Sequence, residues 1–142
     1  MKYFDGCYIA KYYLAEPDSG VVIAAMEAGE PVACSAAGKL EAASVFHRKL
    51  REGIIDIPEY HLLRAQFQLD CAAGLWTWLP VTPHLIDQVF LQYGIVPPHV
   101  FIRSGDALHL VCAAEKGFTE IYSSDRHLLA AAPHFGLKGI KL

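Results

Sequence analysis

The sequence predicts an α/β domain in which a mainly parallel sheet is covered by helices on both faces. Short apolar runs alternate along the chain with longer segments of helical periodicity, as is typical of such sheets. Hydrophobic residues make up 54% of the 142 residues and charged residues only 19%, so a folded globule is expected. No repeat or linker interrupts the sequence, and we therefore expect residues 1–142 to form a single domain.

Five strands and seven helices are expected, with boundaries marked by Pro, Gly and capping residues. The strands are residues 2–4, 31–35, 76–81, 119–122 and a last one near 138–140. The helices are residues 7–14, 19–29, a segment around 40–50, one that follows Pro58 with an apolar face over 62–72, 83–94, 107–116 and 126–132. Pro17 closes the first helix, Pro83 opens the fifth and Gly117 ends the sixth.

Four acidic residues lie where such a fold would place a functional site. Asp5 and Asp125 each follow a predicted strand, and sites in parallel sheets form at the carboxyl ends of strands. Glu41 and Asp106 lie near the starts of helices that are otherwise largely apolar. A single acid near a helix start is often only a cap or a partner of the helix dipole, so the four matter only as a group.

Burying several carboxylates together is unfavourable unless cations neutralise them. Clusters of oxygen ligands suit Mg²⁺ or Mn²⁺. The pattern of acids therefore favours a divalent metal site, although spacing alone does not show that the four converge.

Four segments resemble the motifs of the PIN-domain family, particularly its VapC toxins. The most specific is Arg103-Ser104-Gly105-Asp106-Ala107-Leu108-His109-Leu110, which is similar to the third motif of that family. The first, second and fourth motifs are resembled by residues 3–5, 35–43 and 122–128. Their order and intervals match across nearly the whole chain.

The resemblance implies a three-layer α/β/α PIN-like fold and a metal-dependent endoribonuclease, the toxin of a type II toxin–antitoxin pair. In such an enzyme metal-activated water cleaves RNA phosphodiesters. Asp5, Glu41, Asp106 and Asp125 would be catalytic and would bind Mg²⁺ or Mn²⁺, with Ser123 as a supporting hydroxyl. The implied partners are the RNA substrate, a small antitoxin protein and a second copy in a homodimer.

One departure from the family concerns the two residues after Asp5. The family has Thr or Ser and then Ser or Asn there, whereas this chain has Gly6 and Cys7. We expect Gly6 to leave room for a water molecule and Cys7 to lie beside Asp5 without binding the metal. The departure supports an alternative, a catalytically degenerate PIN-like module that binds RNA or protein. A phospho-acceptor receiver domain is a weaker alternative, because the paired adjacent acids and later Lys of receivers are not evident.

The net charge of −3 gives no general attraction to nucleic acid, so phosphate contacts must come from local basic residues. Lys11, Lys39 and Arg126 lie closer in sequence to the acids than Arg48, Lys49 and Arg51 do, and are the better candidates. His109 is expected to be a hydrogen-bonded core residue, and Trp76 and Trp78 are expected to pack in a strand. No functional role is expected for a further set of charged residues that should be solvated: Asp56, Asp70, Asp87, Arg48, Lys49 and Arg51.

The four cysteines lie far apart without a Cys-x-x-Cys pair, so we expect buried free thiols and neither a disulfide nor a zinc site. No stretch of about 18 apolar residues occurs, which excludes an ordinary membrane-spanning helix. The acid at position 5 is untypical of a secretory signal. A cytoplasmic protein without a membrane segment is expected.

Overall fold

A five-stranded parallel sheet forms the centre of the molecule in the computed structural model, which describes residues 1–142. Its strands are β1 (Lys2–Phe4), β2 (Val32–Ser35), β3 (Trp76–Leu79), β4 (Glu120–Tyr122) and β5 (Lys138–Ile140). The strand order is β3-β2-β1-β4-β5, and every neighbouring pair is parallel. The predicted parallel sheet is confirmed, and the order differs from the 2-1-3-4-5 arrangement of flavodoxin-like receivers.

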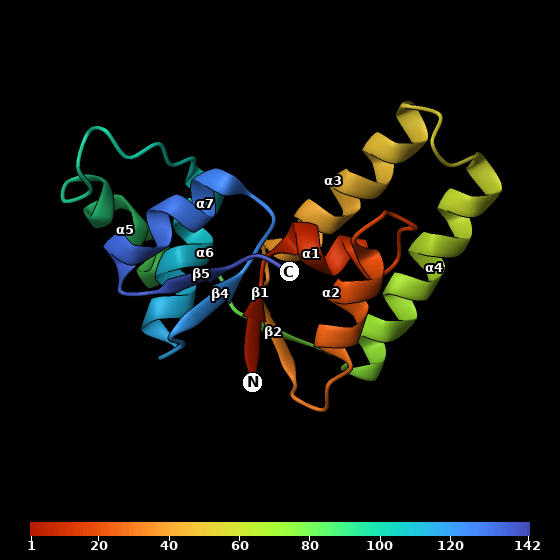
Figure 1. Ribbon diagram of the computed structural model, residues 1–142, viewed down its shortest axis with the longest axis horizontal. Helices are drawn as coiled ribbons and strands as arrows, with labels where there is room; N and C mark the ends of the chain where they lie inside the picture. The colour runs from red at the N-terminus through yellow and green to blue at the C-terminus, as the bar shows by residue number, and fades with distance from the viewer.

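Helices cover both faces of this sheet. They are α1 (Gly6–Lys11), α2 (Ser19–Met26), α3 (Gly38–Arg51), α4 (Ile57–Ala73), α5 (Pro83–Tyr93), α6 (Ser104–Glu115) and α7 (Arg126–Ala131), followed by a 3-10 turn at Ala132–Phe135. Helices α1 to α4 lie on one side of the sheet and α5 to α7 on the other (Figure 1). The predicted three-layer α/β/α architecture is therefore confirmed.

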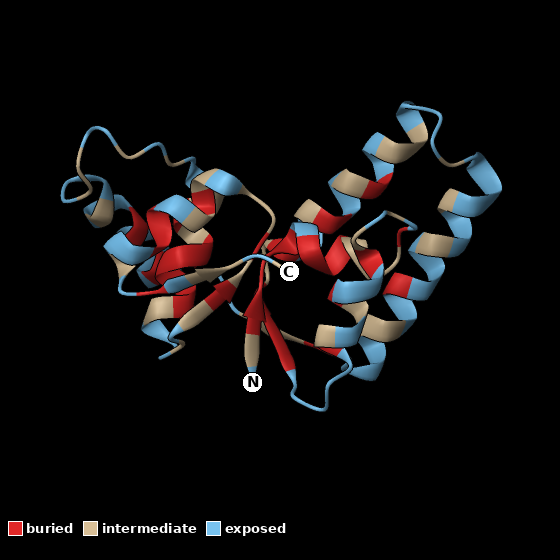
Figure 2. Ribbon diagram, in the orientation of Figure 1, coloured by how far each residue is buried: buried red, intermediate tan, exposed pale blue.

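The central strand β1 joins two hydrophobic cores, because successive side chains of a strand point to opposite faces. Tyr3 packs with Leu110 and residues of α5 to α7, and Phe4 packs with Phe46 and residues of α1 to α4. Buried residues accordingly line both sides of the sheet (Figure 2). Asp5 directly follows this strand, so the two cores on either face hold its position.

Helices α3 and α4 form a hairpin that extends beyond the sheet (Figure 1). Asp56 caps α4 in a reciprocal capping box with Glu59. Asp70 was expected to be solvated, but its carboxylate accepts hydrogen bonds from Tyr13 Oη and Gln66 Nε2, both at 2.8 Å. Asp70 therefore ties α4 to the segment that follows α1.

All four cysteines are free, as predicted, but their expected burial is only half right. Cys34 and Cys112 are buried in the cores, whereas Cys71 is half-buried on the outer helix α4 and Cys7 is exposed. No helix has both the length and the apolar character that crossing a membrane requires.

Candidate functional site

The four predicted acids come together at one pocket of about 440 Å³. Asp5 follows β1 and Asp125 lies beyond β4, while Glu41 and Asp106 lie in the first turns of α3 and α6. These positions meet at the carboxyl edge of the sheet, where β2 and β4 flank β1 on opposite sides. The structure thus brings together side chains from four separate elements.

Asp5 is the most buried of the four, with 3% of its surface exposed. Its Oδ1 accepts a hydrogen bond from Tyr8 N at 2.8 Å and caps α1, and Ser123 Oγ donates to its Oδ2. Burial raises the pKa of Asp5 from 3.8 to about 6, although the neighbouring His109, Ser123 and Tyr8 N–H act in the opposite direction. A cation in the pocket would stabilise the ionised form of this carboxylate.

Ser123 and Asp125 connect the β4 loop to Asp5. Besides contacting Asp5, Ser123 Oγ accepts a hydrogen bond from Asp125 N at 2.9 Å. Asp125 in turn caps α7 through bonds from His127 N at 2.7 Å and Leu128 N at 3.3 Å. Burial acts to raise the pKa of Asp125, but these N–H groups and Arg103 outweigh it and lower the pKa. The supporting position predicted for Ser123 agrees with this geometry.

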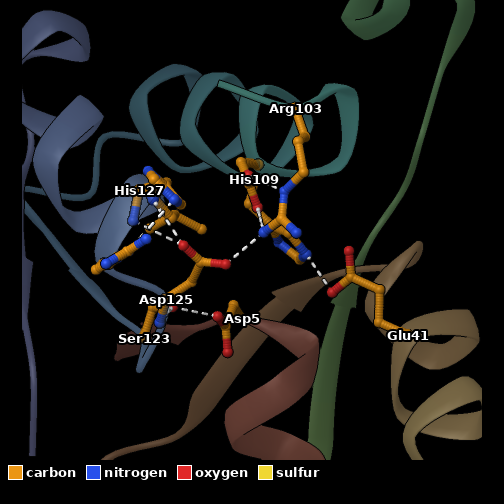
Figure 3. Close-up of polar contacts among 10 residues, drawn as sticks. Asp5, Glu41, Arg103, His109, Ser123, Asp125 and His127 are labelled. Carbon is orange, nitrogen blue, oxygen red and sulfur yellow. Dashed lines mark hydrogen bonds and ion pairs between the residues drawn. The ribbon is translucent and has the colours of Figure 1, made fainter. Parts of the chain in front are cut away.

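Arg103 is a site residue to which sequence reasoning assigned no role. Its Nε donates to Asp106 Oδ2 at 3.0 Å, and its Nη2 bonds Asp125 Oδ2 (Figure 3). The side chain is 58% exposed, so it reaches across the mouth of the pocket and balances two of the four negative charges. The signal in the sequence was its place three residues before Asp106, inside the most specific motif.

The carboxylate of Glu41 contacts the imidazole of His109. His109 Nε2 lies 2.8 Å from Glu41 Oε2, and His109 Nδ1 lies 2.8 Å from Tyr3 Oη (Figure 3 shows the first contact). His109 is 1% exposed, which confirms its prediction as a hydrogen-bonded core residue. Burial opposes protonation of His109, but the bond to Glu41 outweighs it and raises the pKa of the imidazole.

The expectation that Gly6 leaves room for a water molecule is wrong. A Cβ on Gly6 would lie 2.7 Å from Glu41 Cβ and would overlap Glu41 Oε2, so Glu41 fills the space. Cys7 lies beside Asp5 in α1 and lines the pocket, as expected. Partial burial of its thiol, with Asp5 and Glu41 nearby, raises the pKa of Cys7 to about 12, so the thiol stays protonated.

The basic residues at the pocket are not those chosen from the sequence. Lys11 pairs with Glu16 and Asp18, and Lys39 lies over the Trp78 ring at 5.1 Å. Neither residue lines the pocket, nor does Arg126, and their phosphate contacts remain predictions. Arg48 and Arg103 line it instead, and Arg48 is exposed, as expected. Lys49 was also expected to be solvated, but it forms an ion pair with Glu16 at 2.5 Å.

The donor set of the pocket matches a hard divalent cation in type. Carboxylate oxygens are the ligands that Mg²⁺ and Mn²⁺ prefer, and the protonated Cys7 thiol is a poor competitor. As the side chains stand, no three His, Cys, Asp or Glu residues are grouped closely enough to share one ion. Arg103 supplies positive charge between Asp106 and Asp125, and its side chain is largely exposed. The donor types therefore suit a divalent metal, whereas the side chains as placed do not converge on one ion.

Comparison with known proteins identifies the fold. No protein-family model and no curated protein matches the chain. Among solved structures it is similar to VapC20 of Mycobacterium tuberculosis, described as a sarcin-ricin loop cleaving toxin, with a TM-score of 0.69. The match covers 92% of this chain and 95% of that one, at 17% sequence identity. This chain has the VapC-type PIN fold. The resemblance drawn from the four motifs is therefore confirmed for the fold.

Proposed function

We propose that this PIN-fold protein is a metal-dependent endoribonuclease and the toxin of a toxin–antitoxin pair. The observation that carries the proposal is the meeting of Asp5, Glu41, Asp106 and Asp125 in one pocket at the carboxyl edge of the sheet. VapC20, which shares the fold, is described as cleaving the sarcin-ricin loop, an RNA target. A toxin of this kind would act in the cytoplasm, where cellular RNA lies.

The four carboxylates would hold Mg²⁺ or Mn²⁺. When bound, such an ion lowers the pKa of a water molecule and stabilises the charge that builds on the phosphate. The protein prepares the site by fixing its acids: Tyr8 N–H and Ser123 orient Asp5, and the N–H groups of α7 orient Asp125. Arg48 and Arg103 supply guanidinium groups at the pocket that can bind phosphate oxygens of RNA.

The proposed inhibitor is a small antitoxin that covers the acidic pocket with a basic side chain. Arg103 shows that a guanidinium fits between Asp106 and Asp125, and an arginine of the partner could take the same place. Purification of the protein from its native host followed by mass spectrometry should find a small co-purifying chain. Repeated isolation of the protein alone, active and harmless to its host, would contradict this part of the proposal.

The alternative of a degenerate binding module rested on Gly6 and Cys7. The structure accounts for Gly6 by the close approach of Glu41, so the departure by itself does not indicate a lost site. Incubation of the purified protein with total cellular RNA and Mn²⁺ separates the two functions. Cleavage by the wild type and its loss in Asp5→Asn supports the nuclease, whereas RNA retention without cleavage supports the binding module.

A further inference from the structure

Glu41 reaches from α3 across the pocket and is held by two other elements. Its Oε2 accepts a hydrogen bond from Gly6 N of α1 at 3.2 Å and lies 2.8 Å from His109 Nε2 of α6. In Figure 3 the Glu41 side chain extends from its helix toward His109. The orientation of this carboxylate therefore depends on residues 35 positions before it and 68 positions after it.

Only glycine fits beside Glu41 at position 6. An added Cβ would lie 2.8 Å from the Gly38 carbonyl oxygen as well as 2.7 Å from Glu41 Cβ. Gly6 and Gly38 lie where α1 crosses α3, and the buried Ala42 and Phe46 of α3 pack in the core below. The helices cannot separate without disturbing that core, so a larger residue 6 would have to displace the Glu41 side chain.

His109 is held in turn by the sheet. Ser35 N donates to Tyr3 Oη at 3.1 Å, which leaves the Tyr3 hydroxyl proton free to be donated to His109 Nδ1 at 2.8 Å. A neutral imidazole that accepts at Nδ1 carries its proton on Nε2, and this proton points at Glu41. The contacts at both ring nitrogens thus fix the ring orientation of His109, as partners behind a ligand commonly do.

We propose that Gly6 and His109 are positioning residues that fix Glu41 for its role in the pocket. The inference deepens the proposed function and rests on it. The similar family has Thr or Ser at position 6, and the Cβ of either residue would collide here with the Glu41 side chain. Restoring the family residue in this chain alone therefore harms the site instead of improving it.

The test compares Mn²⁺ affinity, measured by calorimetry, with the kcat and KM for RNA cleavage. Gly6→Ser and His109→Leu are each expected to weaken Mn²⁺ binding about tenfold and to lower kcat with little change in KM. His109→Gln, which keeps an N–H donor, should recover part of the loss. Gly20→Ser is the matched control, because no atom lies within 4 Å of a Cβ at Gly20, and it should behave as the wild type.

A second readout does not depend on activity. In ¹⁵N NMR spectra of the metal-free protein, His109 should carry a hydrogen-bonded proton on Nε2 that shifts when Glu41 is changed to Ala. Absence of that shift, or wild-type affinity and kcat in Gly6→Ser, overturns the positioning role. Failure of the wild type to bind Mn²⁺ or cleave RNA would instead contradict the proposed function, and the NMR result would still decide whether His109 holds Glu41.

Discussion

Asp5 directly follows the central strand, and its buried carboxylate accepts hydrogen bonds from Tyr8 N and Ser123 Oγ. Its pKa of about 6 in the fold exceeds the ordinary 3.8, so the folded protein binds more protons than the unfolded chain between these values. Stability from this group is therefore fully present below about pH 4 and is lost as pH rises through about 6, on the order of 3 kcal/mol in all. At neutral pH without metal, the ionised Asp5 opposes folding.

Asp5→Asn should consequently stabilise the metal-free protein at neutral and higher pH. Asparagine can still cap α1 and contact Ser123, but it carries no charge. Thermal melts at about pH 8 should show the variant several degrees above the wild type, and the difference should vanish near pH 4. A melting temperature well below that of the wild type at pH 8 would show that the Asp5 carboxylate is needed for folding.

Under the proposed function, Arg103 and a divalent cation would compete for the carboxylates of Asp106 and Asp125. Arg103→Gln should therefore tighten Mn²⁺ binding in calorimetry. Because the side chain is largely exposed, its ion pairs are weak, and the expected gain is about two- to fivefold. Arg51→Gln removes the same charge at the far end of α3 and should leave the affinity unchanged. Weaker binding in Arg103→Gln alone would mean that Arg103 supports the metal site.

The shared location of the four acids could be predicted from the sequence, because local position is informative, while their role stays a prediction. Asp5, Glu41, Asp106 and Asp125 stand at strand ends or helix starts, and a parallel sheet brings such positions to one edge. The contacts of Arg103 with Asp125 and of Glu41 with His109 join residues 22 and 68 positions apart. Such pairings depend on how the helices cross and have no periodic signal in the sequence.

At the scale of elements, the α1–α3 crossing depends on the absence of side chains at Gly6 and Gly38. A Cβ on Gly38 would overlap the Cys34 sulfur in the buried strand β2. Gly38→Ala should therefore destabilise the protein by about 1 to 3 kcal/mol in denaturant melts. Gly20→Ala, on the open side of α2, should be neutral or slightly stabilising, because alanine favours a helix and meets nothing there. Equal stabilities of the two variants would contradict a tight crossing.

The ends of the helices and strands are predicted less accurately by hydrophobic periodicity than the elements themselves. The first helix was expected to reach Leu14 but ends at Lys11, and the third strand ends at Leu79 instead of continuing to Val81. Pro80 follows Leu79 and has no N–H to donate to a neighbouring strand. Most other bounds agree within two or three residues, because Gly, Pro and capping residues mark them locally.

For the whole molecule, the alternation of strands and helices was sufficient to predict a parallel sheet with two covered faces. The division into two cores at Tyr3 and Phe4 follows from strand geometry once β1 is known to be central. Its central position could not be read from the alternation, since strand order is set by the crossover connections. Pairing of two copies remains a prediction, and light scattering at several concentrations would measure it.

Cleavage of a defined RNA oligonucleotide in ¹⁸O-labelled water with Mn²⁺ tests the central claim most directly. Mass spectrometry of the products should find ¹⁸O in the new terminal phosphate, because water is the proposed nucleophile. Asp106→Asn should abolish the products while retaining the wild-type fold, and a chelator should have the same effect. Unlabelled 2′,3′-cyclic phosphate ends, or equal cleavage without metal, would contradict the assignment of this acidic pocket to metal-dependent hydrolysis.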